Sequence, residues 1–285
     1  MKTMKLGQVS VLALSVLASL SARAAPVIFS GSSIDASDIQ AVVNQFRATL
    51  GTLNPNTTAS FSNGRREINW DGVPDSFASP NSLPGNFFNV NSPRGVVLST
   101  PGTAFQVSAN AGGATPVEFG NINPAYGGQF RPYSPQRLFA PVGSNVVDVS
   151  FFLPGSTTAA LTNGFGSVFT DVDFANVTGI EFFGENNVSL YSAFAPPAGV
   201  SSEGLSFLAV YFTEGNVISR VRITSGTTAL GPNDGGNIDV VALDDFIYGE
   251  PRRPGSAAIP EPGNSVFIGL TLIGLIRVRS RCRSA

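Results

Sequence analysis

Apolar residues near the N-terminus of this chain follow a helical period in one stretch. Ile39, Val42, Val43, Phe46 and Leu50 would share one face of a helix. Ser37 and Gln40 have the spacing of an N-terminal capping box, and Gly51 follows the last apolar position. The pattern predicts one short amphipathic helix between Ser37 and Gly51, which we expect to cover an edge or end of a sheet.

The remainder of the chain carries short runs rich in β-branched and aromatic residues, separated by Gly, Pro, Asn and Ser. Eleven such runs occur, at residues 66–70, 95–98, 105–108, 136–139, 146–153, 165–169, 178–183, 188–194, 207–212, 218–224 and 240–248. Short strands at this spacing are typical of two packed antiparallel sheets. The sequence therefore predicts an all-β, jelly-roll-like two-sheet sandwich with one N-terminal helix.

Large aromatic residues supply the predicted core. The chain has 22 Phe but one Trp and five Tyr, and its only cysteine, Cys282, lies close to the C-terminus. The sandwich should therefore be stabilised by apolar packing and not by disulfides. Trp70 and Tyr126 are the best candidates for exposed rings that bind a ligand, with packing or loop anchoring as the alternative.

Charge and residue usage exclude several classes of function. Residues 25–259 contain ten Arg, no Lys and 18 acidic residues, which gives a net charge of −8. Such a surface disfavours nucleic acid, because phosphate binding depends on basic clusters. The chain has no His, so a Ser-His-Asp or Cys-His arrangement and a His-ligated zinc site are excluded.

A pair of carboxylates is the candidate catalytic chemistry in this sequence. Such a pair can hydrolyse a glycoside when one member acts as general acid. The candidates are Glu118, Glu181, Glu185, Asp171 and Asp173. Chance pairs of this kind are common among 18 acidic residues, so we favour a non-enzymatic protein.

Two acidic pairs, Asp171 with Asp173 and Asp244 with Asp245, suggest a calcium site. Alternate residues of a strand point to the same side, so the Asp171 and Asp173 carboxylates would share a face. Carboxylate oxygens are the ligands that Ca²⁺ prefers. Calcium is thus the one cofactor that the sequence suggests. The alternative is that these residues face solvent and that residues 234–239 form a turn.

The N-terminus has the pattern of a secretory signal peptide. Lys2 and Lys5 precede an apolar stretch at residues 9–20, and Ala22-Arg23-Ala24 supplies the small residues that signal peptidase accepts. We expect export by the Sec pathway and a mature chain that begins near Ala25. The predicted organisation is a signal peptide at 1–24, a sandwich at 25–248, a polar linker at 249–259 and a tail at 260–285.

The tail has three parts in a fixed order. Pro260-Glu261-Pro262 comes first, then an apolar run at residues 265–276, then four arginines, Arg277, Arg279, Arg281 and Arg283. Twelve apolar residues are fewer than the roughly 20 that span a bilayer as a helix, which favours a removable membrane segment over a permanent anchor. A peripheral basic amphipathic end is the alternative.

This tail resembles the PEP-CTERM sorting domain of exported bacterial proteins. The body resembles members of that family in the phrases at residues 64–74, 92–97 and 164–173 and in Asp244-Asp245-Phe246. The resemblance implies an exosortase-type enzyme that cuts near Pro260-Glu261-Pro262, transient attachment to the inner membrane, and a final place at the cell surface or outside the cell. It implies no catalytic residues.

Two hypotheses of function follow. The first is a non-enzymatic extracellular-matrix protein that associates with exopolysaccharide, using loops around Trp70 and Asp171. The second is a glycoside hydrolase that acts on matrix polysaccharide through two carboxylates.

Overall fold

The computed structural model describes residues 25–199 and 203–255. The predicted signal peptide and sorting tail lie outside these residues. Within the two described ranges, no helix is long and apolar enough to cross a bilayer.

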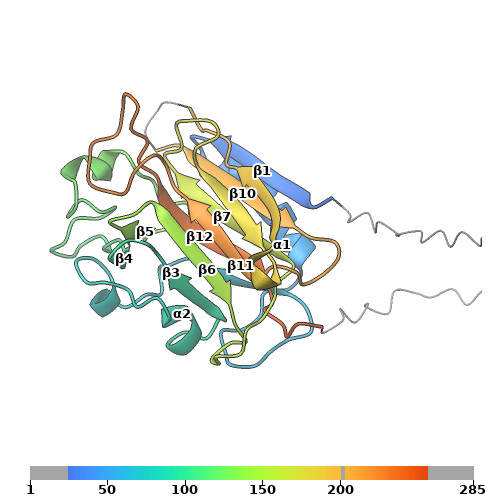
Figure 1. The fold of residues 1–285 in the computed structure, drawn as a ribbon. Coiled ribbons are helices and arrows are strands. Elements are labelled where there is room, and N and C mark those ends of the chain that lie inside the picture. Colours follow the sequence, from blue (N-terminus) through green and yellow to red (C-terminus); the bar gives the residue numbers. More distant parts are fainter. Residues whose placement is uncertain (1–24, 200–202, 256–285) are drawn as a thin grey trace, which may run out of the picture.

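Two antiparallel sheets form the body of the protein (Figure 1). The seven-stranded sheet has the order β1 (Val27–Ser33), β10 (Leu205–Tyr211), β7 (Gly164–Thr170), β12 (Ala242–Gly249), β5 (Phe139–Val142) and β4 (Ala104–Val107), and β2 (Arg65–Ile68) also pairs with β12. The five-stranded sheet has the order β3 (Val96–Ser99), β6 (Val146–Phe151), β11 (Arg220–Thr224), β8 (Gly179–Phe183) and β9 (Ser189–Phe194). The predicted all-β architecture of two antiparallel sheets is confirmed.

The core between the sheets is built from one face of each. Phe165 and Phe169 of β7 and Phe246 of β12 lie here with Val149 of β6 and Val221 of β11. All five side chains are buried. Because neighbouring residues of a strand point to opposite sides, the intervening residues of β7 and β12 are left to form a second layer.

Helix α1 (Ala36–Leu50) forms that second layer on the other face of the larger sheet (Figure 1). Phe46 of the helix packs with Val168 of β7, Phe207 of β10 and Ile247 of β12. The helix therefore covers a face of the sheet and not an edge or end. This arrangement explains why every residue of β7 and of β12 is buried.

The start of α1 differs from the prediction. Asp35 is the N-cap residue and Ser37 lies inside the first turn. Gln40 does not close a capping box, because its amide donates to Asn44 and its carbonyl accepts from the Tyr133 hydroxyl. Gly51 follows the helix as predicted.

Each of the eleven predicted strand segments overlaps an observed strand, but one strand was missed and one is displaced. Strand β1 lies at the edge of the larger sheet, and its Ser and Gly residues hide its alternation. The run predicted at 136–139 becomes β5 at Phe139–Val142. Its first residues are held elsewhere, because the backbone N–H groups of Gln136 and Arg137 donate to Asp71 Oδ1.

Long loops and short helices cover the ends of the sandwich. The short helices are η1 (Asp75–Phe77), α2 (Phe87–Val90), η2 (Pro124–Gly128) and η3 (Glu185–Asn187). A third apolar cluster, which includes Phe119, Phe130 and Val240, lies under the loop around η2.

The segment predicted as a linker begins inside the domain. Gly249 is the last residue of β12, and Glu250 is buried against Arg66. Arg252 exchanges two backbone hydrogen bonds with Leu161. The domain thus continues several residues beyond the predicted boundary at 248.

Candidate functional site

The structure separates the two acidic pairs that the sequence suggested as one calcium site. Asp171 and Asp173 follow β7 and lie with Asp234 and Asp239, whereas Asp244 and Asp245 belong to a different network on β12. Asp171 has a φ of 70°, so the two carboxylates do not continue the alternation of the strand. In the observed arrangement of side chains within residues 25–199 and 203–255, no group of three or more acidic residues is placed to hold a metal ion.

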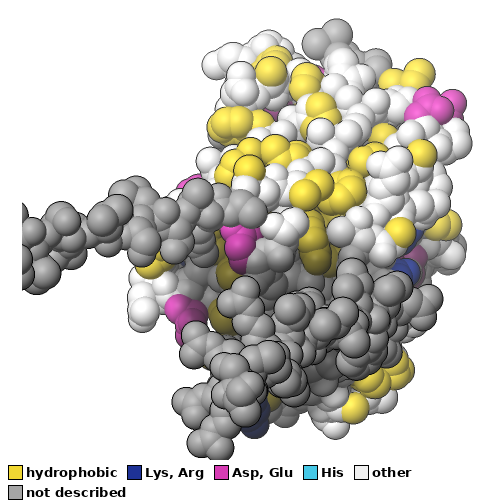
Figure 2. All heavy atoms as spheres, turned by 90° about the vertical axis from the view of Figure 1, so that its right-hand side faces the viewer, with side chains coloured by type: hydrophobic (Ala, Val, Ile, Leu, Met, Phe, Trp, Pro, Cys, Tyr) yellow, Lys and Arg dark blue, Asp and Glu magenta, His cyan; other side chains and the backbone are white. Residues whose placement is uncertain are grey.

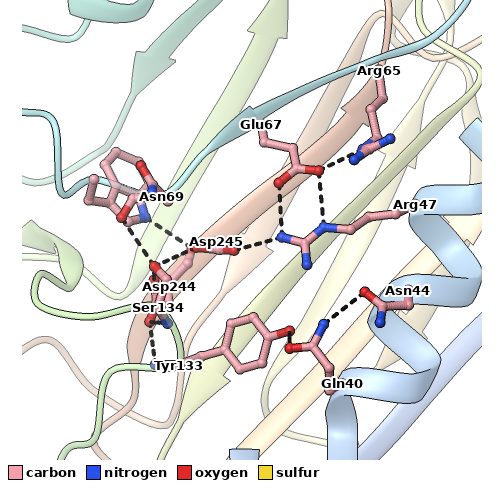
Figure 3. A network of polar contacts seen from close by, with 11 residues as sticks. Gln40, Asn44, Arg47, Arg65, Glu67, Asn69, Tyr133, Ser134, Asp244 and Asp245 are labelled. Carbon is pink, nitrogen blue, oxygen red and sulfur yellow. Dashed lines mark hydrogen bonds and ion pairs between the residues drawn. The ribbon is translucent and has the colours of Figure 1, made fainter. Parts of the chain in front are cut away.

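Asp244 is fully buried and lies where the pairing of β12 with β7 shifts register. Figure 3 shows it beside Ser134 and Asp245. Its Oδ2 accepts hydrogen bonds from the backbone N–H groups of Tyr133 at 2.6 Å and Ser134 at 3.2 Å. Burial, and then the charge of Asp245, raise the pKa of Asp244 well above its usual range. These contacts fix the loop at residues 133–134 on the sheet.

Asp245 joins the same loop to helix α1 (Figure 3). Its Oδ1 accepts from Ser134 Oγ at 2.8 Å, and its Oδ2 accepts from Arg47 Nη2 at 3.2 Å. Arg47 also forms a bidentate ion pair with Glu67 of β2, in which Nε lies 3.0 Å from Oε1 and Nη2 lies 2.9 Å from Oε2. Burial raises the pKa of Asp245 to about 6. The oxygens of Asp244 and Asp245 accept hydrogen bonds that hold the fold together, and calcium binding by this pair stays a prediction.

Asp171 and Asp173 lie near two further aspartates, Asp234 and Asp239. We call these four residues the four-aspartate cluster. Asp173 N donates to Asp239 Oδ1 at 3.4 Å, and Val240 N donates to Asp234 Oδ1 at 2.8 Å. The exposed fractions of Asp171 and Asp239 are 2% and 0%. The cluster lies beside β7 where the 234–239 loop returns to β12.

Charge in this cluster is poorly compensated. Burial, together with the charges of the neighbouring carboxylates, raises the pKa of Asp171 to about 7 and that of Asp239 to about 6. The Gln129 side chain acts on Asp171 as a hydrogen-bond donor, which lowers the pKa of that carboxyl and opposes the effect of burial. Even so, Gln129 Nε2 and Asp171 Oδ2 each have no hydrogen-bond partner among the described residues.

The two aromatic residues proposed as exposed ligand-binding rings are buried. Trp70 is 1% exposed and stacks on Phe139 with ring centroids 4.1 Å apart, while its Nε1 donates to the Asp244 carbonyl. Tyr126 is 0% exposed, and its hydroxyl donates to the Pro232 carbonyl at 2.8 Å. Packing and loop anchoring, the roles weighed against ligand binding, are the ones observed for both residues, and neither ring has the exposure that a ligand-binding ring requires.

The acids considered for hydrolysis do not gather in one place. Glu181 lies on β8 and Glu185 in η3, beside the smaller sheet, whereas Asp171 follows β7 of the larger sheet. Glu118 is the acid of interest here, because burial and the nearby Glu203 raise its pKa to about 7.

A polar hollow lies between two loops at one end of the sandwich. It encloses about 500 Å³ and is lined by residues 75, 79–81 and 109–115, including Asp75, Asn81 and Asn110. Its volume falls within the range of roughly 300–1,000 Å³ found for small-molecule sites. The Asn-, Gly- and Ser-rich composition of residues 52–128 predicted long loops in this region but did not predict the hollow.

Buried Arg137 positions the polar groups of this hollow. Arg137 is 1% exposed, and its guanidinium donates to Asn110 Oδ1 at 2.8 Å, to the Ser108 carbonyl at 3.2 Å and to Asp75 Oδ1. The Asp75 side chain is 86% exposed, so its carboxylate is fixed at one oxygen and open to solvent. An isolated Arg carries no sequence pattern, which is why this residue could not be predicted.

The sorting residues and the signal-cleavage residues Ala22 and Ala24 lie outside the described residues. On the face shown in Figure 2, the described hydrophobic side chains lie among uncharged groups, and basic side chains are sparse.

No known family model matches the sequence, and no protein of established function was found to be similar to it.

Proposed function

We propose that the protein is an exported, non-enzymatic, jelly-roll-like β-sandwich that associates with exopolysaccharide at the cell surface or in the extracellular matrix. Signal peptidase would process its N-terminus near Ala25. An exosortase-type enzyme would process its tail at Pro260-Glu261-Pro262 after transient attachment to the inner membrane. The proposal gives the protein no nucleic-acid partner.

The polar hollow is the observation that supports this function best. Sugar hydroxyls act as both donors and acceptors, so amides and a carboxylate held in fixed positions suit them. Asn81, Asn110 and Asp75 provide these groups, and Arg137 fixes two of the three. Groups that are already ordered bind with a smaller entropic penalty.

Co-sedimentation with the purified exopolysaccharide of the producing organism tests the proposal. The wild-type protein should bind without reducing the polymer mass. Ala114→Trp, which places a large side chain in the lining of the hollow, should weaken binding at least tenfold, as should Asn81→Ala. Ala48→Trp, on an exposed position of α1, is the matched control and should bind normally. Failure of the wild-type protein to bind would overturn the proposal.

A glycoside hydrolase is the second candidate, and Glu118 is the observation that favours it. A carboxyl group with a pKa of about 7 is protonated in about half of the molecules at neutral pH, so it can donate a proton as a general acid. Release of reducing ends from the same polymer, abolished by Glu118→Gln, would establish this activity in place of simple binding.

A further inference from the structure

The four-aspartate cluster contains buried carboxylate oxygens whose charge is not balanced by contacts within the fold. Asp171 Oδ2, Asp173 Oδ1 and Asp239 Oδ2 are buried and have no hydrogen-bond partner among the described residues. A buried carboxylate oxygen without a donor or a cation is strongly destabilising. Gln129 is the one donor near Asp171, and no comparable donor faces Asp173 Oδ1 or Asp239 Oδ2 among the described residues, which indicates that something else interacts with this cluster.

Two parts of the chain bring the carboxylates together. Asp171 and Asp173 follow the end of β7. Asp234 and Asp239 flank a tight turn in which Gly235 and Ile238 exchange backbone hydrogen bonds at 3.0 and 3.1 Å. The φ values of Gly235 and Gly236 are 115° and 68°, which residues with a side chain rarely adopt, so this turn depends on glycine.

The turn is fastened to the domain from outside the cluster. The Tyr126 hydroxyl donates to the Pro232 carbonyl at 2.8 Å and accepts from Gly231 N at 2.7 Å. Asn123 Nδ2 donates to Asn233 Oδ1 at 2.8 Å. Asp234 is thereby held beside the two aspartates that follow β7, despite the repulsion between their charges.

We propose that the four-aspartate cluster binds one calcium ion, with Asp171, Asp173 and Asp239 as the principal ligands and Asp234 as a supporting ligand. Calcium fits better than a transition metal, because the cluster offers carboxylate oxygens and the chain has no His. It fits better than Mg²⁺, because Ca²⁺ accepts irregular sets of six to eight oxygens whereas Mg²⁺ demands a near-ideal octahedron.

Binding requires rotation of side chains. The four carboxylates do not surround a common point as they lie, in agreement with the absence of a preformed metal group in the described ranges. The terminal torsion of Asp is broad, so carboxylates can turn toward an ion without a change in the backbone. The ion would neutralise charges that otherwise repel one another, and the turn at 234–239 would become more rigid.

The site differs from the one that the sequence suggested. Asp171 and Asp173 are retained, but Asp244 and Asp245 are replaced by Asp234 and Asp239. The two candidate sites can be tested separately, because within the described residues Asp234 and Asp239 share no contact with Asp244 and Asp245 that would couple a substitution in one pair to the other.

Terbium luminescence provides a readout that does not depend on stability. Tb³⁺ replaces Ca²⁺ at oxygen sites, and the ring of Tyr126, close enough to Asp234 for its charge to act on the tyrosine, would sensitise its emission. We expect saturable Tb³⁺ emission from the purified protein that excess Ca²⁺ abolishes. We also expect Ca²⁺ to raise the Tm by a few degrees and EDTA to reverse the rise, since a ligand that binds only the folded state stabilises it.

Variants identify the ligands. Asp171→Asn and Asp239→Asn should each weaken Tb³⁺ binding more than tenfold. Asp244→Asn and the exposed Asp35→Asn should leave it unchanged. The proposal is overturned if the wild-type protein gives neither Tb³⁺ emission nor a Ca²⁺-dependent Tm. It is also overturned if Asp171→Asn and Asp239→Asn both bind Tb³⁺ as tightly as the wild-type protein, because the ion would then bind outside the cluster.

Discussion

Arg66 of β2 and Glu250, which follows β12, form an ion pair that is almost completely removed from solvent. The exposed fractions of the two side chains are 0% and 1%, with Arg66 Nε 2.6 Å from Glu250 Oε2 and Nη2 2.9 Å from Oε1. Arg66 also donates to the carbonyls of Pro55 and Ala59. One guanidinium thus joins the loop after α1 to the end of the last strand.

This ion pair predicts a large loss of stability when one partner is removed. Glu250→Ala should lower the free energy of unfolding by about 3–5 kcal/mol, because it leaves a buried cation unpaired. Glu250→Gln should lower it by less, since an amide oxygen can still accept from Arg66. Urea denaturation measures both, with the exposed Glu214→Ala as control. Equal stability of Glu250→Ala and wild type would show that Glu250 does not pair with Arg66 in solution.

Trp70 gives a spectroscopic test of the core, because it is the single tryptophan of the chain. Its burial predicts a blue-shifted emission that acrylamide quenches weakly and that added saccharide does not change. Trp70→Ala should lower the free energy of unfolding by about 3–5 kcal/mol, the usual range for a large aromatic residue in a core. Strong quenching of the native protein would contradict the described packing.

Asp244 and Asp245 predict a stability that declines as the pH rises. Their pKa values are raised in the folded protein, that of Asp245 to about 6, so the folded state binds more protons than the unfolded state above the usual carboxyl pKa of about 4. The contribution to stability is therefore greatest at low pH and is lost as the pH rises through the raised pKa of each group, which is about 6 for Asp245.

Asp244→Asn isolates this effect. Its Tm should fall less steeply between pH 5 and pH 8 than the wild-type Tm, with Asp35→Asn as the control that retains the wild-type slope. Parallel curves for Asp244→Asn and wild type would show that Asp244 does not titrate in this range.

Gly166 of β7 predicts a steric effect between neighbouring strands. A Cβ at this position would lie 2.3 Å from the Ala209 Cβ of β10. Gly166→Ala should therefore destabilise the protein by about 1–3 kcal/mol, as overpacking of a core does. Adding Ala209→Gly should recover part of the loss, and a thermal melt of the single and double variants tests the contact. No recovery in the double variant would place the strain elsewhere.

The sequence by itself determined the class of fold and most of the secondary structure. Short runs rich in β-branched and aromatic residues, bounded by Gly, Pro, Asn and Ser, located eleven of the described strands, and the stripe that ends at Leu50 located the helix. It also excluded histidine chemistry by composition alone. The signal and tail patterns stay predictions about residues that the structure does not describe.

Only the tertiary structure decided which polar residues meet. Asp171 and Asp239 are 68 positions apart in the chain, and Arg137 is 62 positions from Asp75, so no local pattern joins either pair. It also decided which aromatic residues are exposed, since the same ring that would suit a sugar fills the core when it lies between sheets, as Trp70 does. Local periodicity reports burial along one segment, whereas a site depends on the register and packing of segments that are distant in sequence.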